Sequence, residues 1–397
     1  MNKHLIKLVG KNNVLESDED LEAYSIDASL LERRPALVVF PKKVNEIQKI
    51  INYCNRINMP LTLRGAGTNC VGSAIGTNNY IMDFSRMNKV IEFEYENKDK
   101  FIRLQPGIVV ENLNRFLSKY KLTFPILTPE QSASTIGGIL ALNKYGFRAF
   151  KYRRAMNWVS ELEVLDGTGK YYNINNKEDF ENFIGTEGCI GAIASAKLKL
   201  ANNIENVSMD LFGFEDIVQL ITKWREIEKK EGLISLVLFD NISSVFLDLG
   251  EGYHLIAEYE NNKGSVIEPL KIKKLRNKIL GIQNLLADKG YIYRDDPSLP
   301  IDQTYDLFKW LNTNEIPIAG SLYNNTIHCF FNQEQKNLRE EMYELVNKHQ
   351  GNVSSNYGYG ILKKEYTPQI FKRKMMRLKE KYDYNNILNR GEVLDYK

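Results

Sequence analysis

The residues best suited to hold a large charged ligand lie together in one glycine-rich segment, RGAGTNCVGSAIG, at positions 64–76. Its glycines and its small or hydroxyl residues allow positive φ angles and a close approach of the backbone to a bulky group. Successive backbone N–H groups in such a turn form a concave anion site that suits a pyrophosphate. The segment is not a P-loop, since it has no Lys followed by Ser or Thr, and Cys70 stands where a dinucleotide fingerprint has its third glycine. Taken alone, it is also compatible with a tight structural loop.

Two further segments of the same kind follow along the chain. PEQSASTIGGILALNKYG (129–146) carries the pair Gly137-Gly138 among small and hydroxyl residues, and GTEGCIGAIASAKLKL (185–200) places glycines before an alternating strand. Each pattern is weak by itself. Three separate loops that offer N–H and hydroxyl groups, in this order, favour a phosphate-bearing cofactor held in an extended conformation.

With these motifs the chain resembles a known family, the FAD-linked oxidases of the vanillyl-alcohol oxidase/para-cresol methylhydroxylase (PCMH) fold. Within the family it is most similar to the branch of D-lactate, glycolate and D-2-hydroxyglutarate dehydrogenases. The resemblance is dense over 20–200 and looser near the C-terminus. It is carried by LEAYSIDAS (21–29), RPALVVFPKKVNEI (34–47), PLTLRGAGTNCVGSAI (60–75), IMDFSRMNKVIEFE (81–94), LQPGIVVENLN (104–114), STIGGILALNKYGFRAFKY (134–152), GTEGCIGAIASAKL (185–198) and YDYNNILNRGEVL (382–394).

The resemblance implies FAD as the cofactor and assigns residues to it. The first loop would wrap the FAD diphosphate, the second segment would lie along the middle of the cofactor, and the third would meet the flavin or the adenine. The residues so assigned are Arg64, Gly65, Gly67, Thr68, Asn69, Gly72, Ser73, Gly137, Gly138, Asn143, Gly185, Glu187, Gly188 and Ile193. Asn389 would approach the isoalloxazine from the C-terminal side, and we predict it as a catalytic residue.

The first loop also bears on how FAD is attached. Some relatives link FAD to a His of this loop, but here Thr68, Asn69, Cys70 and Val71 follow Gly67. We therefore expect non-covalent FAD, with a thioether to Cys70 as the alternative.

Two arginines stand where the family prefers other residues. Arg153 replaces a Gly and Arg390 replaces a Pro. A guanidinium can hold a carboxylate through a bidentate fork, so both are predicted to bind the substrate, with a local ion pair or a surface position as the alternative.

The hydroxy-acid branch commonly binds a divalent metal through a His-x-x-Gly-Asp-Gly-Asn-x-His-like segment and a Glu-His-Gly-Ile-Gly segment. The corresponding stretches are SLYNNTIH (321–328) and NYGYG (356–360). Ser321 replaces the first His of the family pattern and Asn356 replaces the Glu, whereas His328 keeps the second His. One imidazole with Ser and Asn makes a poor metal site. We predict no tightly bound metal.

The same two stretches supply the candidate acid–base residues. His328 is the candidate base, because an imidazole titrates near neutral pH, with a half-buried histidine of a strand as the alternative. Tyr357 stands where the family has its catalytic His, and it can orient a hydroxyl or exchange a proton. Tyr359 lies in the same glycine-flanked segment, and packing roles are equally open for both tyrosines.

These motifs need a scaffold, and the hydrophobic pattern indicates an α+β fold. Strands are predicted at 36–40, 60–64, 80–84, 89–94 and 101–105, helices at 44–58 and 108–120, and a hairpin at 161–174 around Asp166-Gly167. The strand–helix–strand pattern of 36–64 favours parallel strands. From about 202 a second strand–helix–strand pattern begins, with helices at 265–289 and 334–349, a strand at 326–331 and a final helix at 366–383. We predict a PCMH-type FAD-binding domain at 1–201, a cap domain for the substrate at 202–350, and a segment, 351–397, that returns to the FAD domain near the flavin.

The composition of the chain excludes several other classes of protein. The chain is 43% hydrophobic and 26% charged, with Lys+Arg 53 against Asp+Glu 50, which excludes disordered and disulfide-scaffold proteins. The charges form no basic tail or stripe for nucleic acid. The four cysteines, at 54, 70, 189 and 329, form no CxxC pair and are expected to be buried free thiols. No signal segment or membrane-spanning run is evident, so we expect a cytoplasmic protein, with attachment to a membrane surface left open.

The leading interpretation is an FAD-dependent dehydrogenase or oxidase that oxidises the C–OH of a small 2-hydroxy acid, D-lactate-like or glycolate-like, or of a related polyol, by hydride transfer to flavin N5. A quinone, a partner protein or O₂ would then accept the electrons. One alternative is an aldonolactone or alditol oxidase, or an alkyl-dihydroxyacetonephosphate-synthase-like flavoenzyme. Another is a non-catalytic FAD-binding subunit of a glycolate-oxidase-like complex. The sequence leaves the substrate, the acceptor and the oligomeric state open.

Overall fold

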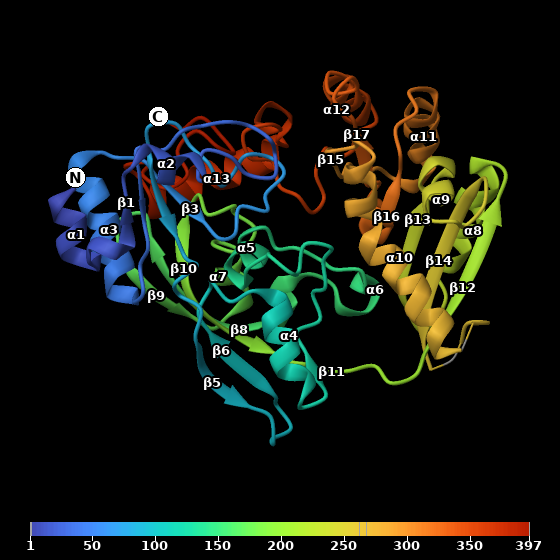
Figure 1. Cartoon of the computed structure of the whole chain (residues 1–397), viewed down its shortest axis with the longest axis horizontal. Helices are drawn as coiled ribbons and strands as arrows, with labels where there is room; N and C mark the ends of the chain where they lie inside the picture. The colour runs from blue at the N-terminus through green and yellow to red at the C-terminus, as the bar shows by residue number, and fades with distance from the viewer. Residues whose placement is uncertain (1, 262, 267, 397) are drawn as a thin grey trace.

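The structure is a computed structural model that describes residues 2–261, 263–266 and 268–396. Figure 1 shows two lobes, a blue-to-green one from the N-terminal half and a yellow-to-orange one from the following segment. The red helix α13 (Gln369–Tyr382) lies with the first lobe, so the chain returns there at its end. In the part of the chain that is described, no helix combines the length and the apolar character that a membrane crossing requires.

A β-α-β unit forms the first sheet of the N-terminal lobe. The strand order is β1-β2-β4-β3, in which β2 (Leu37–Val39) and β3 (Leu61–Arg64) both pair in parallel with β4 (Tyr80–Asp83). The connecting helix α3 (Val44–Ile57) contributes its buried face to one hydrophobic cluster with this sheet. The predicted strands, helix and parallel direction are confirmed, but β4 lies between β2 and β3.

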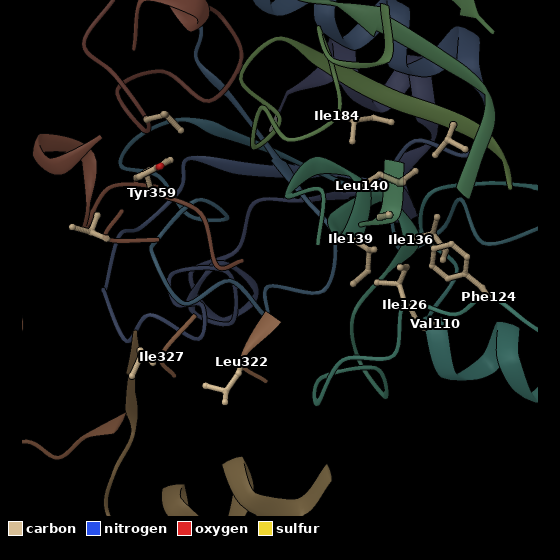
Figure 2. Packing of buried hydrophobic residues seen from close by; sticks show 14 of the residues in the cluster. Val110, Phe124, Ile126, Ile136, Ile139, Leu140, Ile184, Leu322, Ile327 and Tyr359 are labelled. Atoms are coloured by element: carbon tan, nitrogen blue, oxygen red, sulfur yellow. The ribbon is translucent and has the colours of Figure 1, made fainter. Parts of the chain in front are cut away.

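The second sheet is antiparallel and has the order β5-β6-β10-β8-β9. Its strands are β5 (Val90–Glu94), β6 (Phe101–Leu104), β8 (Val159–Asp166), β9 (Tyr171–Ile174) and β10 (Gly191–Lys199). The predicted hairpin at 161–174 is the β8–β9 pair. Figure 2 shows Ile136, Ile139 and Leu140 of helix α5 (Ile136–Ala141) near Val110, Phe124 and Ile126, in the hydrophobic cluster that this sheet shares.

The Gly137-Gly138 pair differs from expectation, because it forms the first turn of α5 and not a loop. Thr135 caps this helix by accepting a hydrogen bond from the N–H of Gly138. A Cβ at Gly137 would lie 2.8 Å from a side-chain carbon of Pro106. The glycine therefore allows the helix start to approach the Pro106 turn closely.

The second lobe has its own sheet, in the order β12-β14-β13-β16, with all pairs antiparallel. The strands are β12 (Val207–Phe214), β13 (Leu233–Phe239), β14 (Tyr253–Glu260) and β16 (Ala319–Ser321), and β15 (Tyr293–Asp295) pairs separately with β17 (Cys329–Phe331). Helices α8 (Ile217–Ile227), α10 (Pro269–Asp288), α11 (Thr304–Thr313) and α12 (Leu338–Lys348) belong to the same lobe. Helix α10 starts later than predicted because Pro269 occupies its first turn, the position that tolerates proline.

Shorter elements complete the described chain. They are α1 (Lys3–Val9), η1 (Lys11–Asn13), β1 (Val14–Leu15), α2 (Asp18–Glu22), α4 (Val110–Ser118), β7 (Leu122–Thr123), α6 (Ala149–Tyr152), η2 (Ala155–Trp158), α7 (Lys177–Phe180), β11 (Ala201–Asn202), α9 (Asn241–Phe246), η3 (Ile301–Gln303), η4 (Tyr323–Asn325) and η5 (Lys364–Tyr366).

Specific contacts join the parts. The N–H of Leu61 in β3 donates to the carbonyl of Ile387 at 2.8 Å, which ties the C-terminal segment to the first sheet. Between the lobes, the guanidinium of Arg148 donates to both carboxylate oxygens of Glu258 at 2.9 and 2.8 Å. The predicted α+β class and the returning C-terminal segment are confirmed. The boundaries at 201 and 350 stay a prediction.

Candidate active site

The glycine-rich loop after β3 presents unpaired main-chain donors to a cavity. Gly67 has φ +69° and Gly72 has φ +83°. The side-chain oxygen of Asn69 accepts the N–H groups of Val71 and Ser73 at 2.8 and 3.0 Å and so fixes the turn. Among the described residues, no acceptor receives the N–H groups of residues 66–70. Orphaned N–H groups in a concave turn are the arrangement that binds an anion.

Arg64 supports this loop from behind. Its guanidinium donates to the carbonyls of Ala74 and Ile26 at 2.9 and 3.1 Å and is only 8% exposed. A Cβ at Gly67 would collide with the guanidinium. The guanidinium is thus engaged with main-chain carbonyls, and the N–H groups of the loop are the donors left to bind an anion.

The three glycine-rich segments line two adjoining cavities, which we call the cofactor cavity. Both walls include Gly65, Thr135, Gly138 and Glu187. The first also includes Gly67, Thr68, Asn69 and Ser73, and the second includes Arg64, Gly137, Gly188 and Ile193. The hydroxyls of Thr68 and Ser134 are 3.3 Å apart and join the first two segments.

Glu187 connects the cofactor cavity with the C-terminal segment. Its carboxylate accepts the N–H groups of Tyr359 and Gly360, at 2.7 and 3.0 Å, and the hydroxyl of Ser73 at 2.9 Å. Burial raises the pKa of this carboxyl, although these hydrogen bonds oppose the rise. Glu187 therefore holds the first and third glycine-rich segments against residues 359–360.

A second cavity, the histidine cavity, opens between the lobes. Its wall comes from both lobes and from the C-terminal segment, and includes Thr128, Glu130, Tyr145, Gln283, Gly320, Ser321, His328, Asn356 and Tyr357. His328 is 7% exposed, and its Nδ1 lies 3.2 Å from the hydroxyl of Tyr357. That hydroxyl also accepts a hydrogen bond from Nε2 of Gln283 at 3.3 Å.

Burial sets the protonation of this pair. It lowers the pKa of His328 below its ordinary value of 6.5 and raises the pKa of Tyr357 well above 10.0. At neutral pH the imidazole is therefore neutral and the phenol is protonated. When Nδ1–H donates to the Tyr357 oxygen, Nε2 carries the lone pair that can accept a proton.

An ion pair lies between the two cavities. Nζ of Lys144, which lines the cofactor cavity, is 3.6 Å from Oε2 of Glu130, which lines the histidine cavity. Burial alone would raise the pKa of Glu130, but Lys144, helped by Arg294, keeps it below its usual value. Arg294 itself donates to Oε1 of Gln283 at 2.9 Å.

Comparison with known proteins fits this geometry. One family model, FAD binding domain, matches residues 35–175, and another, FAD linked oxidases, C-terminal domain, matches residues 268–393. The chain belongs to the FAD-linked oxidase family. FAD is therefore its cofactor, and the orphaned N–H groups of the first loop and the glycines that bring the three segments together fit a bound dinucleotide. It is an FAD-dependent dehydrogenase or oxidase.

Relatives of this flavoenzyme align with nearly the whole chain. A D-2-hydroxyglutarate dehydrogenase of Stutzerimonas stutzeri is 22% identical over 458 residues, covering 97% of each chain. A D-lactate dehydrogenase of Anaerostipes hadrus is 22% identical over 458 residues, covering 98% of this chain and 96% of the relative. The solved structure of p-cresol methylhydroxylase with substrate bound has a TM-score of 0.75 at 14% identity, covering 98% of this chain and 96% of that one. The structural likeness shows the fold.

Several predicted cofactor residues lie outside the cofactor cavity. Asn143 and Gly185 line a neighbouring, more open cavity, which Glu187 also borders. Gly72 forms a turn, where a Cβ would lie 3.0 Å from Leu31. These residues shape the loops, and any contact with FAD remains a proposal for them.

Asn389 lies behind the cavity wall. It accepts the N–H of Leu63 at 2.8 Å and donates to the carbonyl of Glu187 at 2.9 Å and to the carboxylate of Glu392 at 2.8 Å. Both the oxygen and the nitrogen of the Asn389 amide are therefore hydrogen-bonded within the protein, and Asn389 does not line the cavities described above. It holds β3 against the third glycine-rich segment. These contacts give Asn389 a positioning role, and its predicted catalytic role stays a prediction.

The two predicted substrate arginines are not at the histidine cavity. Arg153 is exposed and has φ +61° and ψ −142°, a conformation that favours glycine, which explains the family preference there. Arg390 donates to the carbonyl of Asn386 and to the side chain of Asn58 at 2.7 and 2.9 Å. The cations near the cavity are Lys144 and Arg294 instead. Lys144 lies in the 134–152 motif, whose glycines alone suggested a ligand site. No sequence pattern points to Arg294, because only the fold brings it to Gln283.

The residues that stand at the metal-binding positions of the hydroxy-acid branch lie close together in the structure but make other contacts. Ser321, His328 and Asn356 all line the histidine cavity. The amide of Asn356 is occupied, because its oxygen accepts the N–H of Tyr145 at 2.9 Å and its nitrogen donates to the Tyr145 carbonyl at 3.2 Å. Within the described residues, no group of three or more His, Cys, Asp or Glu is placed to hold a metal ion. The residues present do not fit the family's metal.

Asp296 fixes the segment that carries Tyr357. Its Oδ2 accepts the N–H groups of Ser355 and Tyr357, at 3.1 and 2.7 Å, and also that of Asn356. Its Oδ1 accepts Nζ of Lys363 at 2.9 Å. Both charged residues are fully buried. This carboxylate thus sets where Tyr357 meets His328.

Cys70 is an unfavourable attachment point for FAD. Its side chain is buried, and burial raises the pKa of the thiol to about 11. The thiolate, the reactive form, is therefore scarce at neutral pH. All four cysteines are buried and free, as expected from the sequence.

Proposed function

We propose that this oxidase removes hydrogen from the C–OH carbon of a small 2-hydroxy acid of the D-lactate or glycolate kind. The observation that carries the proposal is the buried His328–Tyr357 pair in a cavity that adjoins the cofactor loops. The names of the relatives, D-2-hydroxyglutarate dehydrogenase and D-lactate dehydrogenase, support the substrate class. When bound, FAD supplies the acceptor for the hydride, at flavin N5.

In this proposal His328 takes the proton of the substrate hydroxyl. The neutral imidazole accepts that proton at Nε2, while Nδ1–H donates to Tyr357. Gln283 also donates to the Tyr357 oxygen, so the phenolic hydrogen is free to point toward the substrate. Tyr357 then orients the hydroxyl or carboxylate that enters the cavity.

The substrate carboxylate is bound by the cations next to the histidine cavity. Lys144 is 3.6 Å from Glu130, and Arg294 reaches Gln283, a residue of the cavity wall. Both are close enough to Glu130 to affect its ionisation. This assignment replaces Arg153 and Arg390.

No step of the proposed reaction uses a metal. The donors Ser321, His328 and Asn356 lack a second imidazole or an anionic oxygen, and the Asn356 amide is engaged with Tyr145. Metal analysis of the purified holoenzyme tests this point. Stoichiometric zinc or manganese would contradict it.

Anaerobic reduction of the bound flavin tests the function. D-lactate, glycolate and D-2-hydroxyglutarate are mixed with the holoenzyme without oxygen, beside an alditol and an aldonolactone. We expect a hydroxy acid to bleach the visible flavin band and to yield the 2-oxo acid. Bleaching only by the alditol or the aldonolactone would refute the hydroxy-acid assignment, and a silent flavin with every compound would favour a non-catalytic subunit. Adding a quinone, O₂ or a candidate partner protein to the reduced enzyme then identifies the acceptor.

A further inference from the structure

The histidine cavity contains an acidic side chain that the proposed oxidation does not use. Glu130 lies in its wall, and the side chain is 12% exposed. Lys144 and Arg294 keep the pKa of this carboxyl below its usual value, so it is ionised at neutral pH. A substrate entering the cavity therefore meets a fixed negative charge in the wall, with the two cations Lys144 and Arg294 behind it.

Two acceptor atoms at this point of the wall lack hydrogen bonds. Oε2 of Glu130 is buried and has no hydrogen-bond partner among the described residues, and the same holds for Oγ1 of Thr128. Thr128 is 2% exposed, and its hydroxyl is close enough to the Glu130 carboxylate to help lower the pKa of that carboxyl. Nζ of Lys144 is 3.6 Å from Oε2 of Glu130, which is an ion pair and not a hydrogen bond, so both acceptors in the cavity wall can still accept hydrogen bonds from a ligand.

The charged side chains considered next to the cavity can neutralise one carboxylate of a substrate. Glu130 offsets one of the two cations, Lys144 and Arg294, and His328 is neutral. Asp296 adds no free negative charge, because main-chain N–H groups and Lys363 occupy its oxygens. Of the charges of Lys144, Arg294 and Glu130, one positive charge is left over, and we assign it to the substrate carboxylate.

We propose that Glu130, with Thr128, makes the oxidase selective for hydroxy acids with a single carboxylate, whose remainder is an alkyl or hydroxyl group. A second carboxylate would meet the Glu130 charge at short range, whereas a hydroxyl could donate to Glu130 or Thr128. The proposal rests on the proposed function for the identity of the first carboxylate. It separates this chain from a dehydrogenase of a dicarboxylate such as 2-hydroxyglutarate.

The test is a binding titration that needs no turnover. 2-Hydroxy-2-methylbutanoate and citramalate have matched skeletons, lack a hydrogen on the hydroxyl carbon, and differ in the second carboxylate. Each is titrated into oxidised holoenzyme while the visible flavin spectrum is followed. We expect the monocarboxylate to bind at least tenfold more tightly, and Glu130→Gln to reduce this ratio to about threefold or less.

Glu111→Gln is the matched control. It makes the same change of charge on α4, whose N-terminus contacts the 130 loop through a hydrogen bond from the N–H of Glu111 to the carbonyl of Gln131, but its side chain is half-exposed. This variant should keep the wild-type ratio. Two results with the wild type alone would overturn the proposal, so the test stands even if Glu130→Gln does not fold. One is equal or tighter binding of citramalate, and the other is that neither compound binds. Failure of the proposed function is a separate result, a flavin that D-lactate, glycolate and D-2-hydroxyglutarate all leave oxidised.

Discussion

The imidazole of His328 and the phenol of Tyr357 are joined at 3.2 Å, although 29 positions separate them in the chain. His328 precedes β17 in the second lobe, whereas Tyr357 lies in the C-terminal segment that Asp296 fixes. The pair therefore forms only when the second lobe and the returning segment meet.

His328→Asn should lower the rate of flavin reduction by the reactive hydroxy acid by about 10²- to 10⁴-fold, since it removes the base. Burial lowers the pKa of His328 below 6.5, and the neutral form is the active one. The wild-type rate should thus fall with acid through a pKa below 6.5 and be flat above it. Stopped-flow reduction across pH measures both. An unchanged rate in the variant with full FAD content would remove His328 from the mechanism.

Tyr357→Phe should slow the same reduction by about three- to tenfold, because one hydrogen bond to the imidazole is lost. Tyr359→Phe is the matched comparison, since its hydroxyl donates to Asn352 at 2.8 Å and makes no contact with His328. Stopped-flow traces of the two variants at equal FAD content separate the roles. Equal loss in both would show that the effect is general packing.

Gly320→Ala should displace the imidazole of His328, the proposed base. A Cβ at this position would lie 2.6 and 2.8 Å from ring and side-chain carbons of His328. We expect at least a tenfold lower reduction rate with normal FAD content, because the base is moved from its place. Gly281→Ala on α10, where a Cβ meets nothing within 4 Å, should leave the rate unchanged and raise stability by up to about 1 kcal/mol. Full activity of Gly320→Ala would contradict the assigned position of His328.

Asp296→Asn should destabilise the protein by about 3 kcal/mol, because it leaves the buried Lys363 ammonium with one carboxylate fewer and turns an amide toward N–H donors. Urea unfolding measures this change. Asp302→Asn, which breaks the exposed pair with Arg225, should cost less than about 1 kcal/mol. Similar losses for the two variants would argue against Asp296 as the fixing point of residues 355–357.

Gly67→Ala should weaken FAD binding by more than tenfold. The residue has φ +69°, and its Cβ would meet the Arg64 guanidinium that supports the loop. Gly391→Ala shares the positive φ, +76°, but its Cβ meets nothing within 4 Å, so it carries the backbone strain of about 1–2 kcal/mol without the collision. FAD titration of the two apoproteins separates strain from collision. Equal FAD affinity in both would show that the Arg64 contact is unimportant.

Acid precipitation should release the flavin into the supernatant. Burial raises the pKa of the Cys70 thiol to about 11, and the loop has no His, so a covalent link is disfavoured. The absorbance of supernatant and pellet decides the matter. Colour in the pellet of the wild type, lost in Cys70→Ser, would establish a thioether instead.

The sequence by itself determined the cofactor and the local elements. The glycines of the three segments indicated a phosphate-bearing cofactor, and the resemblance to the FAD-linked oxidases identified it as FAD. The helix over 44–57 and its flanking strands followed from local periodicity, which depends only on neighbouring residues. His328 and Tyr357 could be chosen because they occupy positions in a recognised motif.

Tertiary structure decided which charged residues serve the cavity. Arg153 and Arg390 were chosen from sequence departures, yet one lies in solvent and the other holds Asn58, because motif position does not fix side-chain direction. Glu130 and Lys144 both lie in the 129–146 segment of the first lobe, whereas Arg294 belongs to the second lobe and comes close to them only when the lobes pack together. Long-range contacts of this kind leave no periodic or compositional trace, so the electrostatics of the site belong to the fold and not to any one stretch of sequence.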